Sequence, residues 1–84
     1  MSELSKNQLA HIRGEVKRAV EWDLLPRHVR GRLFDEGRMR RQAQQMALIK
    51  YPHAPWMHEA FIRQYCDLYQ AHYPKEGFHV EVTS

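Results

Sequence analysis

Four prolines limit where helices can run in this chain of 84 residues. Proline breaks a helix interior and disfavours helical geometry in the residue before it. Pro26 is expected to end a first helix near Trp22–Leu24, Pro52 and Pro55 to bracket a short turn, and Pro74 to end a last helix. The length is that of one domain, so we expect the whole chain to form a single helical domain.

The first helix has a recognisable start. Ser5 and Gln8 have the spacing of a capping box, in which each side chain binds the other residue's backbone N–H. Leu4 and Leu9 flank this start as a hydrophobic staple would. An apolar stripe then recurs at helical spacing and predicts a core-facing side, formed by Leu9, Ile12, Val16, Ala19 and Val20.

Pro26 suits the first turn of a second helix, because its missing N–H is not needed there. Val29, Leu33 and Phe34 are its expected apolar contacts, and Gly37 is its expected C-terminal cap.

A third helix is expected from about Arg38 to Ile49. The alternative is one long helix through Gly37, but its apolar stripe would meet Arg40 where an apolar residue is needed, which favours two helices. The inner face of the third helix is predicted to comprise Met39, Ala43, Met46 and Ala47.

The last helix, starting at Pro55, is apolar over an unusually wide arc. One stripe is formed by Met57, Ala60, Phe61, Tyr65 and Leu68, and a second by Ile62, Cys66, Tyr69 and Tyr73. The second stripe is either another core layer or a protein-binding surface. A core layer is favoured because a small domain has few apolar residues to spare. The protein-interaction candidates are Trp56, Ile62, Tyr69 and Tyr73, together with Phe78 and Val80.

After a turn at Gly77, residues 78–82 alternate in the manner of a β-strand. No second strand is evident, so this tail is frayed, lies extended on the helices, or pairs with another chain. The expected fold is therefore all-α, with four helices and an extended or single-strand tail over residues 78–84.

Positive charge is concentrated in the middle of the chain. Residues 26–51 hold seven basic and two acidic side chains, a net charge of +5, whereas residues 1–25 are neutral and residues 52–84 carry −2. Six of the seven are arginines, which bind phosphates and base edges in bidentate fashion. A basic helix after a short turn resembles a helix-turn-helix. The alternative is a solvated, arginine-rich face that only keeps the protein soluble. The candidates for binding nucleic acid or an acidic protein surface are Arg27, Arg30, Arg32, Arg38, Arg40, Arg41, Gln42 and Gln45.

Nothing in the sequence indicates catalysis, a cofactor or a metal. The six histidines and Cys66 do not pair at metal-ligand spacings, and no glycine-rich phosphate loop is present. Cys66 lies in an aromatic stripe, which favours an inert buried thiol. The longest aliphatic run, Met46–Ile49, is far too short to span a membrane. A polar N-terminus and a single cysteine favour the cytoplasm.

We therefore expect a small non-enzymatic accessory or regulatory protein that acts on nucleic-acid transactions. It would bind DNA or RNA through residues 27–50, or dock on an enzyme that processes nucleic acid. The alternative is a protein-interaction inhibitor or adaptor that uses the aromatic face of the last helix and the C-terminal strand. A phage-encoded modulator of a host enzyme is compatible with the size and build of the chain. Neither hypothesis requires a small-molecule substrate.

Overall fold

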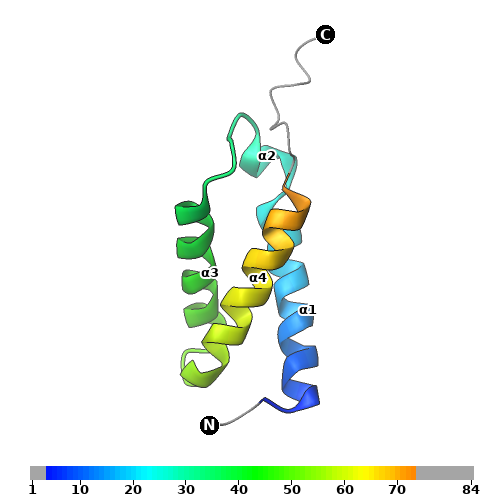
Figure 1. The fold of residues 1–84 in the computed structure, drawn as a ribbon, viewed down its shortest axis with the longest axis vertical. Helices are drawn as coiled ribbons and strands as arrows, with labels where there is room; N and C mark the ends of the chain where they lie inside the picture. Colours follow the sequence, from blue (N-terminus) through cyan, green and yellow to red (C-terminus); the bar gives the residue numbers. More distant parts are fainter. Residues whose placement is uncertain (1–3, 74–84) are drawn as a thin grey trace.

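The computed structural model describes residues 4–73, and these fold into an all-α arrangement in which α4 packs against both α1 and α3 (Figure 1). The expected all-α class is thus confirmed for this part of the chain. The predicted tail over residues 78–84 lies outside the described residues. The helices are α1 (Lys6–Asp23), α2 (Pro26–Val29), α3 (Glu36–Lys50), the 3₁₀ helix η1 (Pro55–Met57) and α4 (His58–His72).

The start of α1 forms the predicted capping box. The backbone N–H of Gln8 donates to the Ser5 hydroxyl at 3.1 Å, and the backbone N–H of Ser5 donates to the Gln8 side chain at 2.9 Å. The helix ends at Asp23, as Pro26 requires. Its inner face buries Ile12, Val16, Ala19 and Val20, whereas Leu9, which lies in the first turn at the end of the bundle, is only half-buried.

The second helix is shorter than predicted. Only one turn forms, Pro26–Val29, and the chain then passes through Gly31 at a φ of 75°. That left-handed backbone is easy for glycine and costly for other residues, and it is incompatible with continuing the helix. Leu33 and Phe34 consequently lie in a loop, 73% and 42% exposed, instead of on a helix face.

Gly37 is also not the cap that the sequence suggested. The Asp35 side chain accepts a hydrogen bond from the Arg38 backbone N–H at 3.1 Å and starts α3 at Glu36. A carboxylate at this position accepts a hydrogen bond from an otherwise unpaired backbone N–H, and its negative charge interacts favourably with the positive end of the helix dipole. Gly37 is therefore inside α3, and the helix–turn–helix arrangement with Gly37 in the turn does not form.

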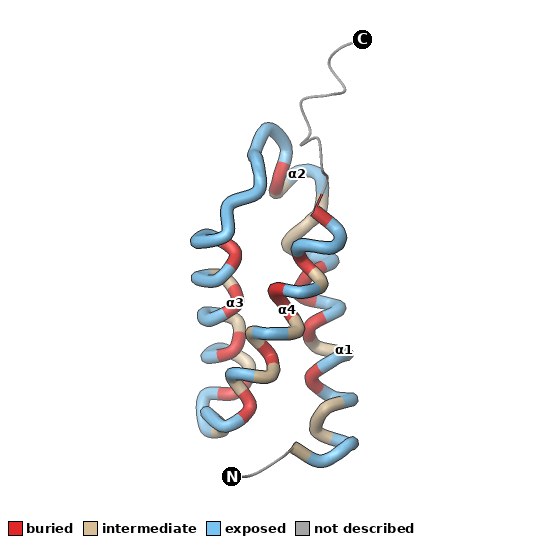
Figure 2. The backbone as a smooth tube through the Cα atoms, in the orientation of Figure 1, coloured by how far each residue is buried: buried red, intermediate tan, exposed pale blue. Residues whose placement is uncertain are grey.

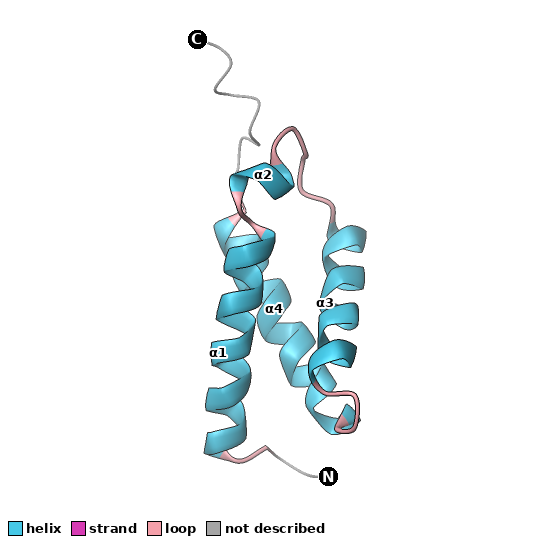
Figure 3. Cartoon of the chain, turned by 180° about the vertical axis from the view of Figure 1, so that it is seen from behind, coloured by secondary structure: helices cyan, strands magenta, loops and turns pink. Residues whose placement is uncertain are grey.

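The core lies where α4 meets the inner faces of α1 and α3, as the burial along the backbone shows (Figure 2). From behind, α1 and α3 run on either side of α4 (Figure 3). Met39, Ala43 and Ala47 of α3 are buried as predicted, and Met46 is half-buried. We call the row of rings along α4 the aromatic ladder, whose neighbouring centroids lie 5.5–6.1 Å apart; it comprises Tyr51, Phe61, Tyr65, Tyr69 and Tyr73.

Candidate nucleic-acid interface

Basic side chains gather where α1 passes through α2 into α3. Arg27 lies on α2, Arg30 and Arg32 lie in the following loop, and Arg38 lies in the first turns of α3; all four are exposed. This is the upper end of the molecule in Figure 1, opposite the turn that joins α3 to η1. We call it the arginine end, defined by Arg27, Arg30, Arg32 and Arg38.

The two acidic residues of the same segment form other interactions. Asp35 caps α3, and Glu36 pairs with Arg40 at 2.9 Å, one turn along that helix. Among residues 4–73, the ion pairs include none of the four arginines of the arginine end. The four guanidiniums of the arginine end therefore form no ion pair with a carboxylate of the described residues, although Asp23 lines the same cavity as Arg32 and Arg38.

A small cavity of about 160 Å³ opens at the arginine end. It brings together three residues predicted from the sequence, Arg32, Arg38 and Gln42, from the loop and from α3. Sequence reasoning did not single out two others, Asp23 and His28. Asp23 carried a signal, because a carboxylate at a helix C-terminus opposes the helix dipole and so suggests a tertiary partner. The lining residues are Asp23, His28, Val29, Arg32, Arg38, Gln42 and Tyr69.

Two hydrogen bonds fix the position of the Asp23 carboxylate. Its Oδ2 accepts a hydrogen bond from the Tyr65 hydroxyl and another from the Gln42 amide at 3.4 Å. Burial, followed by the hydrogen bond to Asp23, raises the pKa of Tyr65 well above its ordinary value, so the phenol remains a donor. No hydrogen bond within the described residues reaches the other carboxylate oxygen, Oδ1.

Tyr73 anchors the arginine loop to α4. Its hydroxyl donates to the backbone carbonyl of Arg32 at 2.6 Å. Burial raises the pKa of both Tyr69 and Tyr73, and the positive charges of Arg32 and Arg38 oppose that rise, which reflects how close the two guanidiniums lie to these phenols. The loop that carries Arg32 is thus tied to the Tyr73 end of the aromatic ladder.

Aromatic surface lies beside these charges. Trp22 is 59% exposed, and the Arg27 guanidinium carbon lies 5.3 Å from the centre of its ring. His28 donates from Nδ1 to the Trp22 carbonyl at 2.7 Å, since a carbonyl can only accept. Phe34 contacts the Tyr73 ring edge-on at 5.6 Å and remains partly exposed. Exposed rings interleaved with arginines are typical of surfaces that bind unpaired bases.

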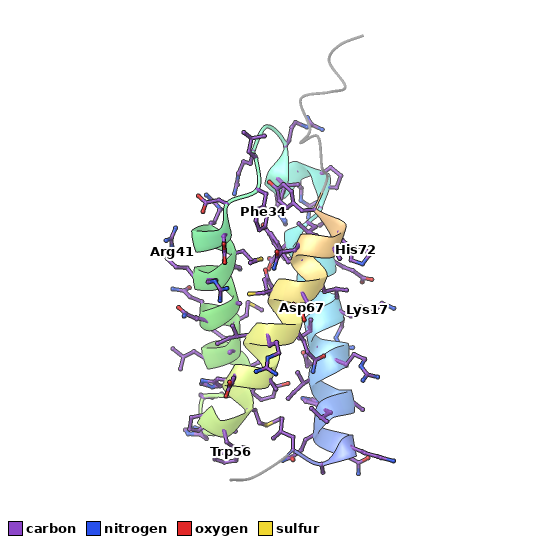
Figure 4. All side chains as sticks on the ribbon, in the orientation of Figure 1. Lys17, Phe34, Arg41, Trp56, Asp67 and His72 are labelled. Atoms are coloured by element: carbon purple, nitrogen blue, oxygen red, sulfur yellow. The ribbon has the colours of Figure 1, made fainter. Side chains whose placement is uncertain are left out.

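The other predicted basic-segment residues are dispersed. Arg40 pairs with Glu36 and lines a cavity on the α4 side together with Ile62 and Cys66. Arg41 points outward from α3 (Figure 4), and Gln45 is exposed. The proposed common face of Arg38, Arg41, Gln42 and Gln45 is incomplete, because Gln42 turns inward to Asp23.

The predicted protein-interaction residues do not form one common surface. Tyr69 and Tyr73 are buried in the aromatic ladder, and Ile62 is half-buried. Trp56 is 59% exposed and lies at the end opposite the arginine end (Figure 4). Phe78 and Val80 lie outside the described residues.

A second, larger cavity of about 710 Å³ runs between α1 and α4. Its floor includes Val16, Val20 and Leu68. Lys17 on α1 and Asp67 on α4 line its two sides (Figure 4). It is therefore an apolar channel with charged borders.

Residues 4–73 offer little for metal or thiol chemistry. Within residues 4–73, no three His, Cys, Asp or Glu side chains cluster closely enough to hold a metal ion. Cys66 is buried, and burial raises the pKa of its thiol, which disfavours the reactive thiolate. None of the helices in this part of the chain has the length and apolar character needed to cross a bilayer.

Comparison with known proteins adds no relative. No protein-family model, no curated protein and no solved structure matches this chain. The arguments for its function therefore rest on the residues and their arrangement.

Proposed function

We propose that this protein is a non-enzymatic accessory protein that binds nucleic acid through the arginine end. The observation that carries the proposal is the set of four exposed arginines, none of which forms an ion pair within residues 4–73. Uncompensated arginines attract phosphate and release counterions from it, which is the main source of sequence-independent affinity for nucleic acid.

The architecture favours unpaired strands over the major groove of a duplex. The helix α2 is a single turn of four residues, too short to serve as the first, supporting helix of a helix-turn-helix, and Gln42 of α3 turns inward to Asp23. Arg27 beside the exposed Trp22 ring, and Phe34 close by, combine charge with stacking surface. Stacking on an aromatic ring contributes about 1–3 kcal/mol per base and is tolerant of sequence.

The test is a titration of labelled single-stranded RNA, single-stranded DNA and duplex DNA at several salt concentrations. Wild type should bind the single strands with a steep dependence on salt. Arg27→Gln and Arg30→Gln should each lower the slope of log affinity against log salt by about 0.7–0.9, the contribution of one phosphate contact. Arg41→Glu, one turn beyond Arg38, should also weaken binding through charge reversal without lowering the melting temperature.

The matched control is Arg63→Gln. Arg63 is an exposed arginine on α4 that pairs with Glu59 at 3.5 Å, so its loss should leave the slope unchanged. If wild type binds none of the three nucleic acids at low salt, or if Arg63→Gln lowers the slope as much as Arg30→Gln does, the proposal is wrong.

A second candidate function is recognition of a protein partner, and the cavity between α1 and α4 favours it. Its apolar floor suits an amphipathic helix, and Arg13 and Lys17, which share the α1 border with Glu21, can pair with acidic residues along one edge of that helix. Binding of this kind should persist at high salt, be lost in a folded Leu68→Arg variant, and be unaffected by Arg38→Gln. An affinity pull-down with and without nuclease treatment would separate the two candidates.

A further inference from the structure

We propose that the cavity at the arginine end is a base-reading pocket that takes one unpaired guanine of a single-stranded nucleic acid. This inference rests on the proposed function and names the chemistry of its ligand. The cavity measures about 160 Å³. Liquid water occupies about 30 Å³ per molecule, so the space would hold about five waters, the scale of one small planar group. Sites that enclose whole drug-sized ligands run to about 300–1,000 Å³.

The pocket offers hydrogen-bond donors and acceptors side by side. Arg32 and Arg38 present guanidinium donors from the loop and from α3. Asp23 presents a carboxylate from the end of α1, with Oδ2 occupied by Tyr65 and Gln42 and with Oδ1 free of hydrogen bonds from the described residues. A ligand that fills the pocket must therefore both accept and donate.

This mixed chemistry disfavours a phosphate group inside the pocket. A phosphate only accepts, and it would lie against the Asp23 carboxylate at close range, where like charges repel. The phosphates are better placed on the outer arginines, Arg27 and Arg30, which have no carboxylate partner among residues 4–73.

Guanine matches the pocket better than the other bases do. Its O6 and N7 accept from an arginine fork, which is the commonest base-specific contact of arginine. Its N1–H and amino group donate together toward one carboxylate, a role that Asp23 can fill through the free Oδ1. Adenine and cytosine each offer a single amino group to a carboxylate, and uracil offers a single ring N–H.

The guanine must be unpaired. A base in a duplex has its Watson–Crick edge occupied, so a pocket can read that edge only when the base is single-stranded or extruded. The exposed Trp22 and Phe34 rings beside the pocket suit stacking of the neighbouring unpaired bases.

The experiment measures binding of short oligouridine strands that carry a single central guanine, adenine or cytosine, at moderate salt, with the deoxy versions alongside. Wild type should bind the guanine strand about 5- to 150-fold more tightly than the others, the discrimination expected of one good bidentate base contact. Asp23→Asn should remove this preference, because the amide nitrogen would present a donor where guanine needs an acceptor.

The same substitution removes a negative charge, so affinity for the adenine and cytosine strands should stay the same or rise. A loss of folding would weaken binding of every strand, so it could not lower the affinity for the guanine strand alone. Far-ultraviolet circular dichroism checks that the variant is folded. The control is Tyr65→Phe, which removes the hydroxyl below Asp23 but leaves the carboxylate in the pocket; it should keep the guanine preference.

Equal, salt-dependent binding of all the strands would overturn the guanine pocket while leaving the proposed function standing. Retention of the guanine preference in Asp23→Asn would also overturn it. Absence of binding to any strand would overturn both the pocket and the proposed function.

Discussion

Replacing Phe61 by alanine should remove a large part of the stability of this domain. The Phe61 side chain is 0% exposed, and its ring lies 5.9 Å from that of Tyr51 and 6.1 Å from that of Tyr65. Truncating a buried phenylalanine costs about 3–5 kcal/mol, because the apolar transfer free energy is lost and the surroundings collapse only in part. A domain of this length has a total unfolding free energy of about 4–13 kcal/mol.

The assay is thermal unfolding followed by far-ultraviolet circular dichroism. For a domain of this size each kcal/mol corresponds to about 4–8 °C, so the midpoint should fall by roughly 12–40 °C. Phe34→Ala is the matched control, since it makes the same truncation in a loop residue that is 42% exposed. Phe34→Ala should lower the unfolding midpoint by less than half as much as Phe61→Ala. Equal shifts for the two variants would show that Phe61 is not the centre of the core and would refute the reasoning.

Four further predictions concern two glycines of the backbone, the α3 cap and the phenols. Gly14→Ala should raise the unfolding free energy by about 0.5–1 kcal/mol, because Gly14 lies within α1 and only the flexible Arg18 side chain approaches the new methyl, at 3.9 Å. Gly31→Ala should lower it by about 1–2 kcal/mol, since the φ of 75° is strained for alanine although no atom lies within 4 Å; urea titration checks both signs. Asp35→Ala should cost about 0.5–2 kcal/mol by removing the α3 cap, and the same titration would contradict this if its midpoint did not move. The unfolding free energy should fall as pH rises above about 10, by up to about 1.4 kcal/mol per pH unit for each tyrosine of the aromatic ladder. Burial raises the pKa of each above the ordinary 10.0, so the folded state keeps protons that the unfolded chain loses. Urea titrations from pH 8 to about 11.5 test this, and a flat profile would contradict it.

The sequence predicted helix ends and inner faces correctly wherever they depend on residues close together in the chain. Ser5 and Gln8 predicted the start of α1, and Pro26 predicted its end. The helical spacing of apolar residues predicted the inner faces of α1, α3 and α4, including the buried positions of Ile12 and Phe61. These predictions held because capping, proline geometry and helical periodicity depend on a few adjacent residues and hardly on the rest of the fold.

The middle of the chain showed the limit of such rules. Gly37 was predicted to end the second helix, and neither Gly31 nor Asp35 was predicted as a helix boundary. The structure places the break at Gly31 and the α3 cap at Asp35, leaving Leu33 and Phe34 in a loop. Competing local signals of about 1 kcal/mol each are decided by whichever arrangement lets the helices pack.

The sequence by itself determined the helical class, the outer boundaries of the helices, and the concentration of arginine in the middle of the chain. Tertiary structure alone decided which polar groups meet. Asp23 and Tyr65 are 42 residues apart and share a hydrogen bond, and the Tyr73 hydroxyl reaches the Arg32 carbonyl across 41 residues. The pocket at the arginine end exists because α4 closes against α1 and α3. That contact depends on the shape of the whole core, which no pattern within one segment encodes.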